Sequence, residues 1–237
     1  MTRTLGPSAV VLGARRIGAA IVDRLITDGW RVTAVARSEE TVQAARTRGA
    51  RAVRADVTDP DALSAVLAAA TDEYAGLDLI VNAAAGPVPP GPFGGGPIAD
   101  ADLPAFRRWA VAVAERTFVF LNAGAVALRR TGGGALIQLT GGSSVRAQAG
   151  RGPWAAGAFA TRALTQAAAL ELRDAGIHVA LLIVDGAIGP HTAIDQHNAI
   201  DQHTALDVEL PEIAAAVAYL ATPGEVRRVH ELRLGRR

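Results

Sequence analysis

The sequence contains neither cysteine nor lysine, and arginine supplies all 24 of its basic residues. Without cysteine, the chain can form no disulfide, bind no metal through thiolate and use no cysteine nucleophile. Without lysine, no catalytic site in this chain can contain an ammonium side chain.

Strong net charge and long apolar runs are missing as well. The formal net charge is +1 over 237 residues, so no long-range field attracts nucleic acid or an anionic membrane. No apolar run reaches the roughly 18 residues of a membrane span, and the N-terminal residues lack the order of a secretory signal. We therefore expect a cytoplasmic protein without nucleic-acid or membrane partners.

Short apolar runs alternate with alanine-rich helical stretches along the whole chain, and half of the residues are hydrophobic. This alternation predicts an α/β fold: one domain, residues 1–237, with a doubly wound parallel sheet covered by helices on both faces. Seven strands are expected, at Ala9–Leu12, Arg31–Ala36, Ala52–Ala55, Leu79–Asn82, Leu136–Leu139, Val179–Val184 and Glu231–Leu234. Helix starts are predicted at Thr58 or Asp59 followed by Pro60, and at Pro211.

Two segments depart from this alternation. Residues 86–97 contain ten glycines and prolines in twelve positions, which predicts a loop after the fourth strand. Residues 186–209 are expected to form a lid, in which a six-residue motif places His191, His197 and His203 at equal intervals. These histidines could bind a metal or act as bases, but a short duplication in a surface loop explains the repeat without any function. No metal site is predicted.

Four pieces of sequence, in order, are typical of a nucleotide site. Gly13 and Gly18 lie in a turn between a strand and a helix, where glycine lets backbone N–H groups approach phosphate. Arg37 follows the second strand, where a guanidinium favours a ribose 2′-phosphate. Asp56 follows the third strand and Asn82 ends the fourth.

With these motifs the whole chain resembles the short-chain dehydrogenase/reductase family. The resemblance implies a Rossmann fold, a dinucleotide cofactor, and homodimers or homotetramers packed through two long helices. Arg37, with Arg15 or Arg16, would select NADP(H) over NAD. The implied cofactor-binding residues are Gly13, Arg15, Arg16, Ile17, Gly18, Arg37, Asp56, Val57, Asn82, Ala83 and Ala84.

The cofactor motifs differ from the family pattern at several positions. The family turn reads Gly-x-x-x-Gly-x-Gly, whereas the span from Gly13 to Gly18 is one residue shorter and has Arg16 in place of the middle glycine. A side chain there obstructs the approach of backbone to pyrophosphate. Ala83 and Ala85 replace the second asparagine and the glycine of the family's Asn-Asn-Ala-Gly.

The catalytic positions differ further. Family reductases use a tyrosine as proton donor, a lysine four residues later, a serine and a helical asparagine. In the register set by the long helix, the tyrosine maps to Trp154, the lysine to Ala158 and the serine to Gly141. No asparagine lies at 112–114. An indole N–H can orient an oxygen but cannot supply a proton.

Other side chains are candidates for this site. The candidate catalytic residues are Ser143, Trp154, Asp185 and His191, of which the last two could act as bases. An apolar substrate pocket is expected around Trp154, with Phe93, Thr140, Ser144 and Phe159. Core packing of Trp154 is the alternative interpretation, but its position at the start of the helix that lines the active site in the family favours the pocket.

Three functions remain open on this sequence. The first is a non-redox enzyme that cyclises, dehydrates or isomerises an apolar, natural-product-like substrate, chiefly by positioning it. The second is an NADPH-dependent carbonyl reductase with an unconventional proton donor. The third is a non-catalytic partner of an active relative, whose small residues at 155–163 would allow close helix packing.

Overall fold

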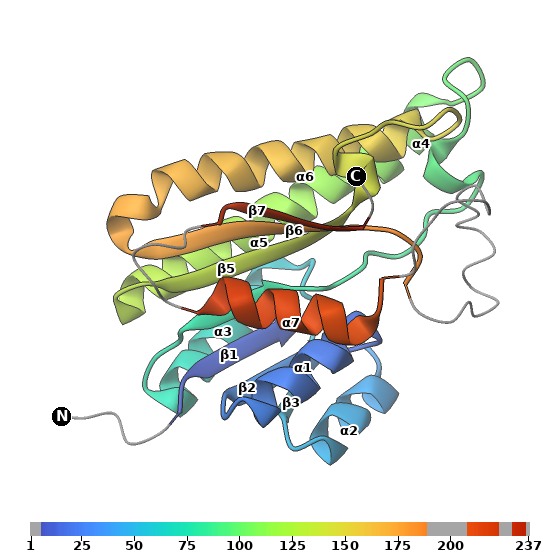
Figure 1. Cartoon of the computed structure of the whole chain (residues 1–237). Helices are drawn as coiled ribbons and strands as arrows, with labels where there is room; N and C mark the ends of the chain where they lie inside the picture. Colours follow the sequence, from blue (N-terminus) through green and yellow to red (C-terminus); the bar gives the residue numbers. More distant parts are fainter. Residues whose placement is uncertain (1–5, 189–207, 223–228, 236–237) are drawn as a thin grey trace.

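The computed structural model describes residues 6–188, 208–222 and 229–235. Its sheet has seven parallel strands in the order β3-β2-β1-β4-β5-β6-β7 (Figure 1). The strands are β1 (Ser8–Leu12), β2 (Arg31–Ala36), β3 (Arg51–Arg54), β4 (Leu79–Asn82), β5 (Gly134–Gly141), β6 (Ile177–Asp185) and β7 (Glu231–Gly235). All seven predicted strands are confirmed, and this is a doubly wound Rossmann-type sheet. Strands β5 and β6 extend beyond their predicted bounds, and β3 begins and ends one residue earlier.

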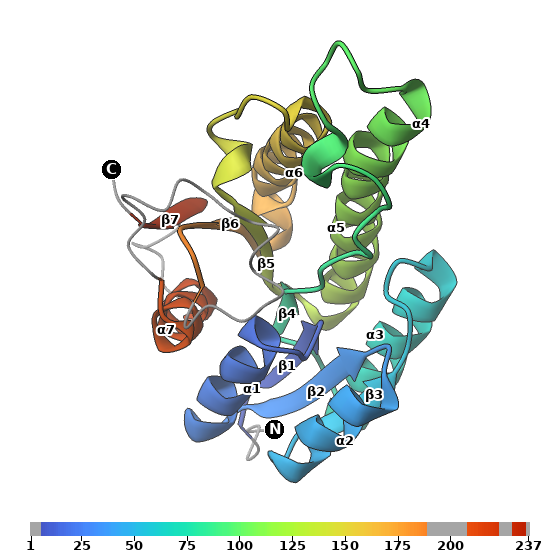
Figure 2. The ribbon, with the colours of Figure 1, turned by 90° about the vertical axis from the view of Figure 1, so that its right-hand side faces the viewer.

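Helices cover both faces of the sheet. On one face lie α1 (Ile17–Thr27), α2 (Glu39–Thr47) and α7 (Leu210–Ala221) (Figure 2). On the other lie α3 (Pro60–Tyr74), α5 (Ala112–Thr131) and α6 (Gly152–Glu171). The short α4 (Leu103–Phe106) runs into α5 through a π-helical turn at Arg107–Val111.

A separate apolar core fills each layer. Leu25 of α1 and Ile213 and Val217 of α7 are fully buried on one face. Leu63 of α3 and Phe120 of α5 are buried at 0% and 2% exposure on the other. Buried on both faces, the central strands carry continuous apolar runs, as expected of a parallel sheet.

The predicted helix starts are confirmed. The Asp59 carboxylate accepts hydrogen bonds from the N–H groups of Asp61 and Ala62, and Pro60 takes the first position of α3. Pro211 lies in the first turn of α7. The first backbone N–H groups of a helix have no partner within the helix. A capping carboxylate accepts hydrogen bonds from some of them, and proline suits the first turn because it has no N–H group.

The continuous helix from Leu103 to Thr131 is long and apolar enough to cross a membrane by length and composition, with a mean hydropathy of 1.5 over an 18-residue stretch. Its inner face packs inside the protein, where Phe120 and Leu128 are almost fully buried. A core helix of a folded domain passes the same test.

The glycine- and proline-rich segment 86–97 is a loop containing one short 3₁₀ turn at Phe93–Gly95. Its end lies against the start of α6, where Gly96 bridges to Arg151. A Cβ on Gly95 would lie 2.7 Å from the Pro153 side chain. Loop and helix are therefore in direct contact. Most of the predicted lid, including His191, His197 and His203, lies outside the described residues.

Candidate nucleotide cleft and adjoining catalytic positions

A cavity of about 500 Å³ opens at the carboxyl ends of β1, β2 and β4. In a doubly wound sheet, this is the edge where ligands bind, at the point where strand order reverses. Ten of the eleven predicted cofactor residues line it: Gly13, Arg15, Arg16, Ile17, Arg37, Asp56, Val57, Asn82, Ala83 and Ala84. Gly18 lies beneath the same turn.

Glycine is required twice in the turn before α1. Gly13 has φ +86°, and a Cβ there would lie 2.5 Å from the Ala84 Cα. A Cβ on Gly18 would lie 1.8 Å from the Gly13 carbonyl oxygen. The turn therefore packs backbone against backbone at the N-terminus of α1, the end of a helix that favours an anion. The N–H groups of Gly13 and Ala14 themselves donate to the carbonyl oxygen of Val35.

Arg16 distinguishes this turn from a plain glycine-rich one. It caps α1 with φ +38°, a left-handed backbone value that costs free energy in any residue with a Cβ. Its Nη2 donates a hydrogen bond to the carbonyl oxygen of Ile188, which follows β6, at 2.5 Å. The side chain thus spans the cleft.

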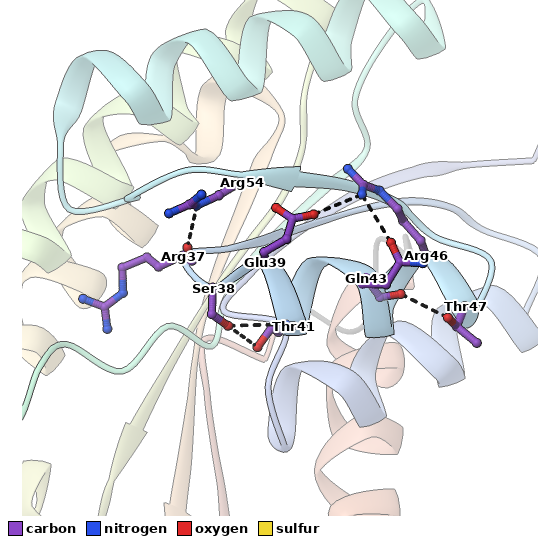
Figure 3. A network of polar contacts seen from close by, with 8 residues as sticks. All are labelled: Arg37, Ser38, Glu39, Thr41, Gln43, Arg46, Thr47 and Arg54. Carbon is purple, nitrogen blue, oxygen red and sulfur yellow. Dashed lines mark hydrogen bonds and ion pairs between the residues drawn. The ribbon is translucent and has the colours of Figure 1, made fainter.

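Arg37 lies between β2 and α2. Its carbonyl oxygen accepts a hydrogen bond from Nε of Arg54 at 3.0 Å, and the following Ser38 caps α2 through its hydroxyl (Figure 3). Figure 3 shows the guanidinium pointing away from this network. The backbone of Arg37 is held in place while its exposed charge lines the cavity.

Asp56 lies at the end of the cavity near β3. Its Oδ1 accepts hydrogen bonds from Thr58, at 3.0 Å from the backbone N–H and 2.8 Å from the hydroxyl. These bonds and the nearby charge of Arg37 lower the pKa of Asp56. The carboxylate is therefore ionised at neutral pH.

Arg116 of α5 is a cavity residue that the sequence patterns missed. Its guanidinium packs under the loop, since a Cβ on Gly86 would lie 2.5 Å from its Cζ. Burial lowers the pKa of Arg116, and the positive charge of Arg37 lowers it further. The negative charge of Glu115 partly offsets this shift. Nothing local in an alanine-rich helix signals this placement.

Asn82 lies at the centre of the cleft with little exposure. Its amide donates to Oε1 of Gln138 at 2.9 Å, and its Oδ1 accepts from the N–H of Ala84 at 3.2 Å. These bonds use the side chain to fix the ends of β4 and β5 against each other.

Trp154 belongs to an aromatic cluster of three rings. Its indole centroid lies 5.8 Å from that of Phe93 and 5.5 Å from that of Trp109, and Phe93 and Trp109 are 5.2 Å apart. Trp109 is 2% exposed, and Arg151 lies over the Phe93 ring. The two pairs that involve Trp109 are edge-to-face, and the pair of Phe93 and Trp154 is tilted. Aromatic pairs of this kind stabilise the loop and α6 against the π-helical turn.

The hydroxyls after β5 differ in accessibility. Ser144 is fully buried, and its hydroxyl donates to the carbonyl oxygen of Gly141 at 2.9 Å. Thr140 and Ser143 are half-buried, on β5 and in the 3₁₀ turn Gly142–Ser144. Of the predicted hydroxyls, these two are the accessible ones.

Asp185 ends β6 and is paired with two arginines. Its Oδ2 accepts from Nη2 of Arg233, and its Oδ1 lies 3.5 Å from Nη2 of Arg146. A Cβ on Gly142 would collide with its carboxylate. A carboxylate held in this way is a weaker candidate for a general base.

Two other predicted site residues do not join the cluster. Phe159 is 41% exposed and lies on the outer face of α6 with Leu170, which is 69% exposed. His191 lies outside the described residues. Among the residues described, no group of three or more acidic or histidine side chains could hold a metal.

Three small residues of α6 serve contacts within the chain. A Cβ on Gly157 would lie 2.9 Å from the Trp109 carbonyl oxygen, and Ala155 and Ala158 are buried at 4% and 3% exposure. These positions therefore bring α6 close to the π-helical turn before α5. Ala163, farther along the same helix, is exposed.

Comparison with known proteins agrees with this architecture. The family model described as short chain dehydrogenase matches residues 7–198. The chain belongs to the short-chain dehydrogenase/reductase family. It is 30% identical to 2,5-dichloro-2,5-cyclohexadiene-1,4-diol dehydrogenase from Sphingobium indicum, over 81% of this chain and 77% of that one. It is 32% identical to 3-alpha-(or 20-beta)-hydroxysteroid dehydrogenase from Mycobacterium bovis, over 75% and 67%.

Solved structures show the same fold. An actinorhodin polyketide ketoreductase with NADPH is 25% identical, with a TM-score of 0.78 over 98% of this chain and 97% of that one. A metagenomic short-chain oxidoreductase in complex with NADP is 26% identical, with a TM-score of 0.74 over 98% of both chains. Members of the family thus hold a nicotinamide cofactor on this scaffold.

Proposed function

We propose that this chain binds NADP(H) in the cleft at the ends of β1, β2 and β4 and acts on a small apolar molecule without the family's tyrosine–lysine proton transfer. The proposed binding of NADP(H) rests on this cavity, which Arg37 lines. The turn before α1 brings the N-terminus of that helix to the cavity, where a pyrophosphate would bind, and Asp56 remains ionised beside the adenosine end.

The chemistry is proposed from what surrounds Trp154. This indole packs with Phe93 and Trp109, Ala158 is buried, and the chain has no lysine. Bound NADPH would supply a hydride, but no phenol or amine of this helix would supply the matching proton. Losing a general acid costs about 10²–10⁴ in rate. A non-redox cyclisation, dehydration or isomerisation, promoted by positioning beside the aromatic cluster, suits such a site better.

Carbonyl reduction is the second candidate, with Thr140 or Ser143 passing a proton from water. The cavity itself favours it, as do relatives named as dehydrogenases and a ketoreductase with NADPH. Single-turnover incubation with NADPH deuterated at C4 distinguishes the two candidates. Deuterium in a product would support reduction, whereas a converted substrate without deuterium supports the non-redox reaction.

Cofactor binding is tested separately, by calorimetric titration of NADP⁺ and NAD⁺. We expect wild type to prefer NADP⁺, and Arg37→Gln to lose about ten- to a hundredfold in NADP⁺ affinity with little change for NAD⁺. Arg46→Gln, which removes an exposed charge on α2 away from the cavity, is the matched control. Equal weak binding of both nucleotides by wild type would refute the proposed selectivity.

A further inference from the structure

We infer that Arg116 is a second phosphate-binding arginine. It binds the 2′-phosphate of the cofactor from α5, while Arg37 binds the same phosphate from the end of β2. The inference rests on the proposed binding of NADP(H). It adds a specificity-determining residue that lies outside the β2–α2 region.

The two arginines reach one cavity from different layers of the fold. Arg37 enters from the end of β2, and Arg116 from the second turn of α5 under the loop at Gly86. Within residues 6–188, 208–222 and 229–235, no hydrogen bond or ion pair engages either guanidinium. Both sets of N–H donors therefore remain available to a ligand.

Electrostatics favours an anion between them. The positive charge of Arg37 lowers the pKa of Arg116, so the two cations are close enough to repel each other. The carboxylate of Asp56, whose pKa the charge of Arg37 lowers, already accepts two hydrogen bonds from Thr58. A phosphate monoester carries about −1.5 to −2 charges at neutral pH and would relieve this repulsion from both sides.

Gly86 keeps the Arg116 side chain in this position. A Cβ there would collide with Cζ, Nε and Nη2 of Arg116 at 2.5–2.8 Å. The backbone of the loop thus forms one wall of the guanidinium site. This contact restricts a long side chain that otherwise has many rotamers, which reduces the entropy lost when phosphate binds.

Stacking on the adenine ring is the other role that an arginine could have here. A stacked guanidinium would strengthen NAD⁺ and NADP⁺ binding by the same factor, because both carry adenine. A phosphate-binding guanidinium strengthens only NADP⁺. The ratio of the two affinities therefore distinguishes the roles.

The test is calorimetric titration of wild type, Arg116→Gln and Arg116→Lys with NADP⁺, NAD⁺, 2′,5′-ADP and 5′-ADP. Arg116→Gln should weaken NADP⁺ and 2′,5′-ADP about tenfold or more, while NAD⁺ and 5′-ADP change less than about twofold. Arg116→Lys keeps the positive charge, so its NADP⁺ affinity should lie between those of wild type and Arg116→Gln. It replaces the glutamine variant if that variant fails to fold. Arg130→Gln, at the exposed end of α5, is the control.

Each outcome has one meaning. Loss shared equally by NAD⁺ and NADP⁺ would overturn the inference in favour of stacking. Unchanged NADP⁺ affinity in both Arg116 variants would overturn it outright while leaving the proposed function intact. Failure of wild type to bind NADP⁺ would instead refute the proposed function.

Discussion

The guanidinium of Arg16 crosses the nucleotide cleft and donates to the carbonyl oxygen of Ile188, 2.5 Å away, which ties the turn before α1 to the segment after β6. An extended dinucleotide leads from the adenosine end through this point. With NADP(H) bound as proposed, the cofactor would run past this contact, and we expect Arg16 to release Ile188.

Replacing Arg16 with glycine should tighten binding of NADP⁺. Glycine adopts φ +38° without the cost that a Cβ imposes, and its backbone can approach pyrophosphate. We expect a dissociation constant about threefold to tenfold lower, a change of roughly 1 kcal/mol. Titration calorimetry measures it, with Arg46→Gln, on α2 away from the cavity, as the control. Weaker binding by Arg16→Gly would identify Arg16 as a phosphate ligand.

Gly13→Ala should destabilise the protein more than Gly29→Ala. The two glycines have similar φ values, +86° and +84°, so the backbone strain of an added Cβ is matched. Only Gly13 also faces another backbone, with the Ala84 Cα at 2.5 Å, whereas nothing lies within 4 Å of a Cβ at Gly29. Strain alone costs about 1–3 kcal/mol, and overpacking adds a further 1–3 kcal/mol at Gly13.

Urea unfolding of the two variants measures that difference directly. Equal loss of stability would show that the turn and β4 separate easily. In that case the cleft would be less rigid than the contact between Gly13 and Ala84 indicates.

Trp154→Phe and Trp154→Ala should separate packing from catalysis. The alanine variant removes two ring contacts and should lose about 2–4 kcal/mol of unfolding free energy, less than for a fully buried tryptophan. The phenylalanine variant keeps a ring against Phe93 and Trp109 and should lose less than about 1.5 kcal/mol.

Once a substrate is known, the phenylalanine variant also tests the indole N–H. We expect its kcat to stay near that of wild type, because the indole acts through packing. A large fall in kcat with unchanged stability would show that the N–H orients the substrate.

Asp56 gives a prediction for the acid range. Its folded-state pKa is lowered by the hydrogen bonds from Thr58 and by Arg37. A lowered pKa contributes stability above the unfolded value of about 4, and this stability is lost as pH falls through the folded value. Because Asp56 is exposed, the contribution should be less than about 1 kcal/mol.

Asp56→Asn is therefore expected to be slightly less stable than wild type at pH 7, with the difference shrinking as pH falls below the unfolded pKa and through the lowered folded pKa. Chemical denaturation at several pH values measures it. A difference that persists unchanged at pH 2.5 would show that the asparagine disturbs the turn for another reason.

Local signals were sufficient to predict the sheet and most of the residues that the sequence motifs assign to the cleft. Apolar strand-length runs and the caps at Asp59 and Pro60 depend on neighbouring residues, so they could be read from the sequence. Arg37 and Asp56 follow strands directly, and the carboxyl ends of parallel strands share one edge of a sheet.

Contacts between side chains from helices and loops that are far apart in the sequence could not be predicted from local signals. Arg116 lies in the middle of a helix, and only the path of the loop at Gly86 makes it part of the cavity. Phe159 was placed with Trp154 because they are close in sequence. Five positions on a helix, however, rotate a side chain about 140° around the axis, which puts Phe159 on the outer face.

A crystal structure of the protein grown with NADP⁺ tests these conclusions most directly. It should show the 2′-phosphate between Arg37 and Arg116, the pyrophosphate at the turn from Gly13 to Gly18, and the nicotinamide near Trp154 with no proton-donating phenol beside it. An ionisable side chain within hydrogen-bonding distance of both the nicotinamide ribose and a bound carbonyl would contradict them, because ordinary reduction would then have its proton donor.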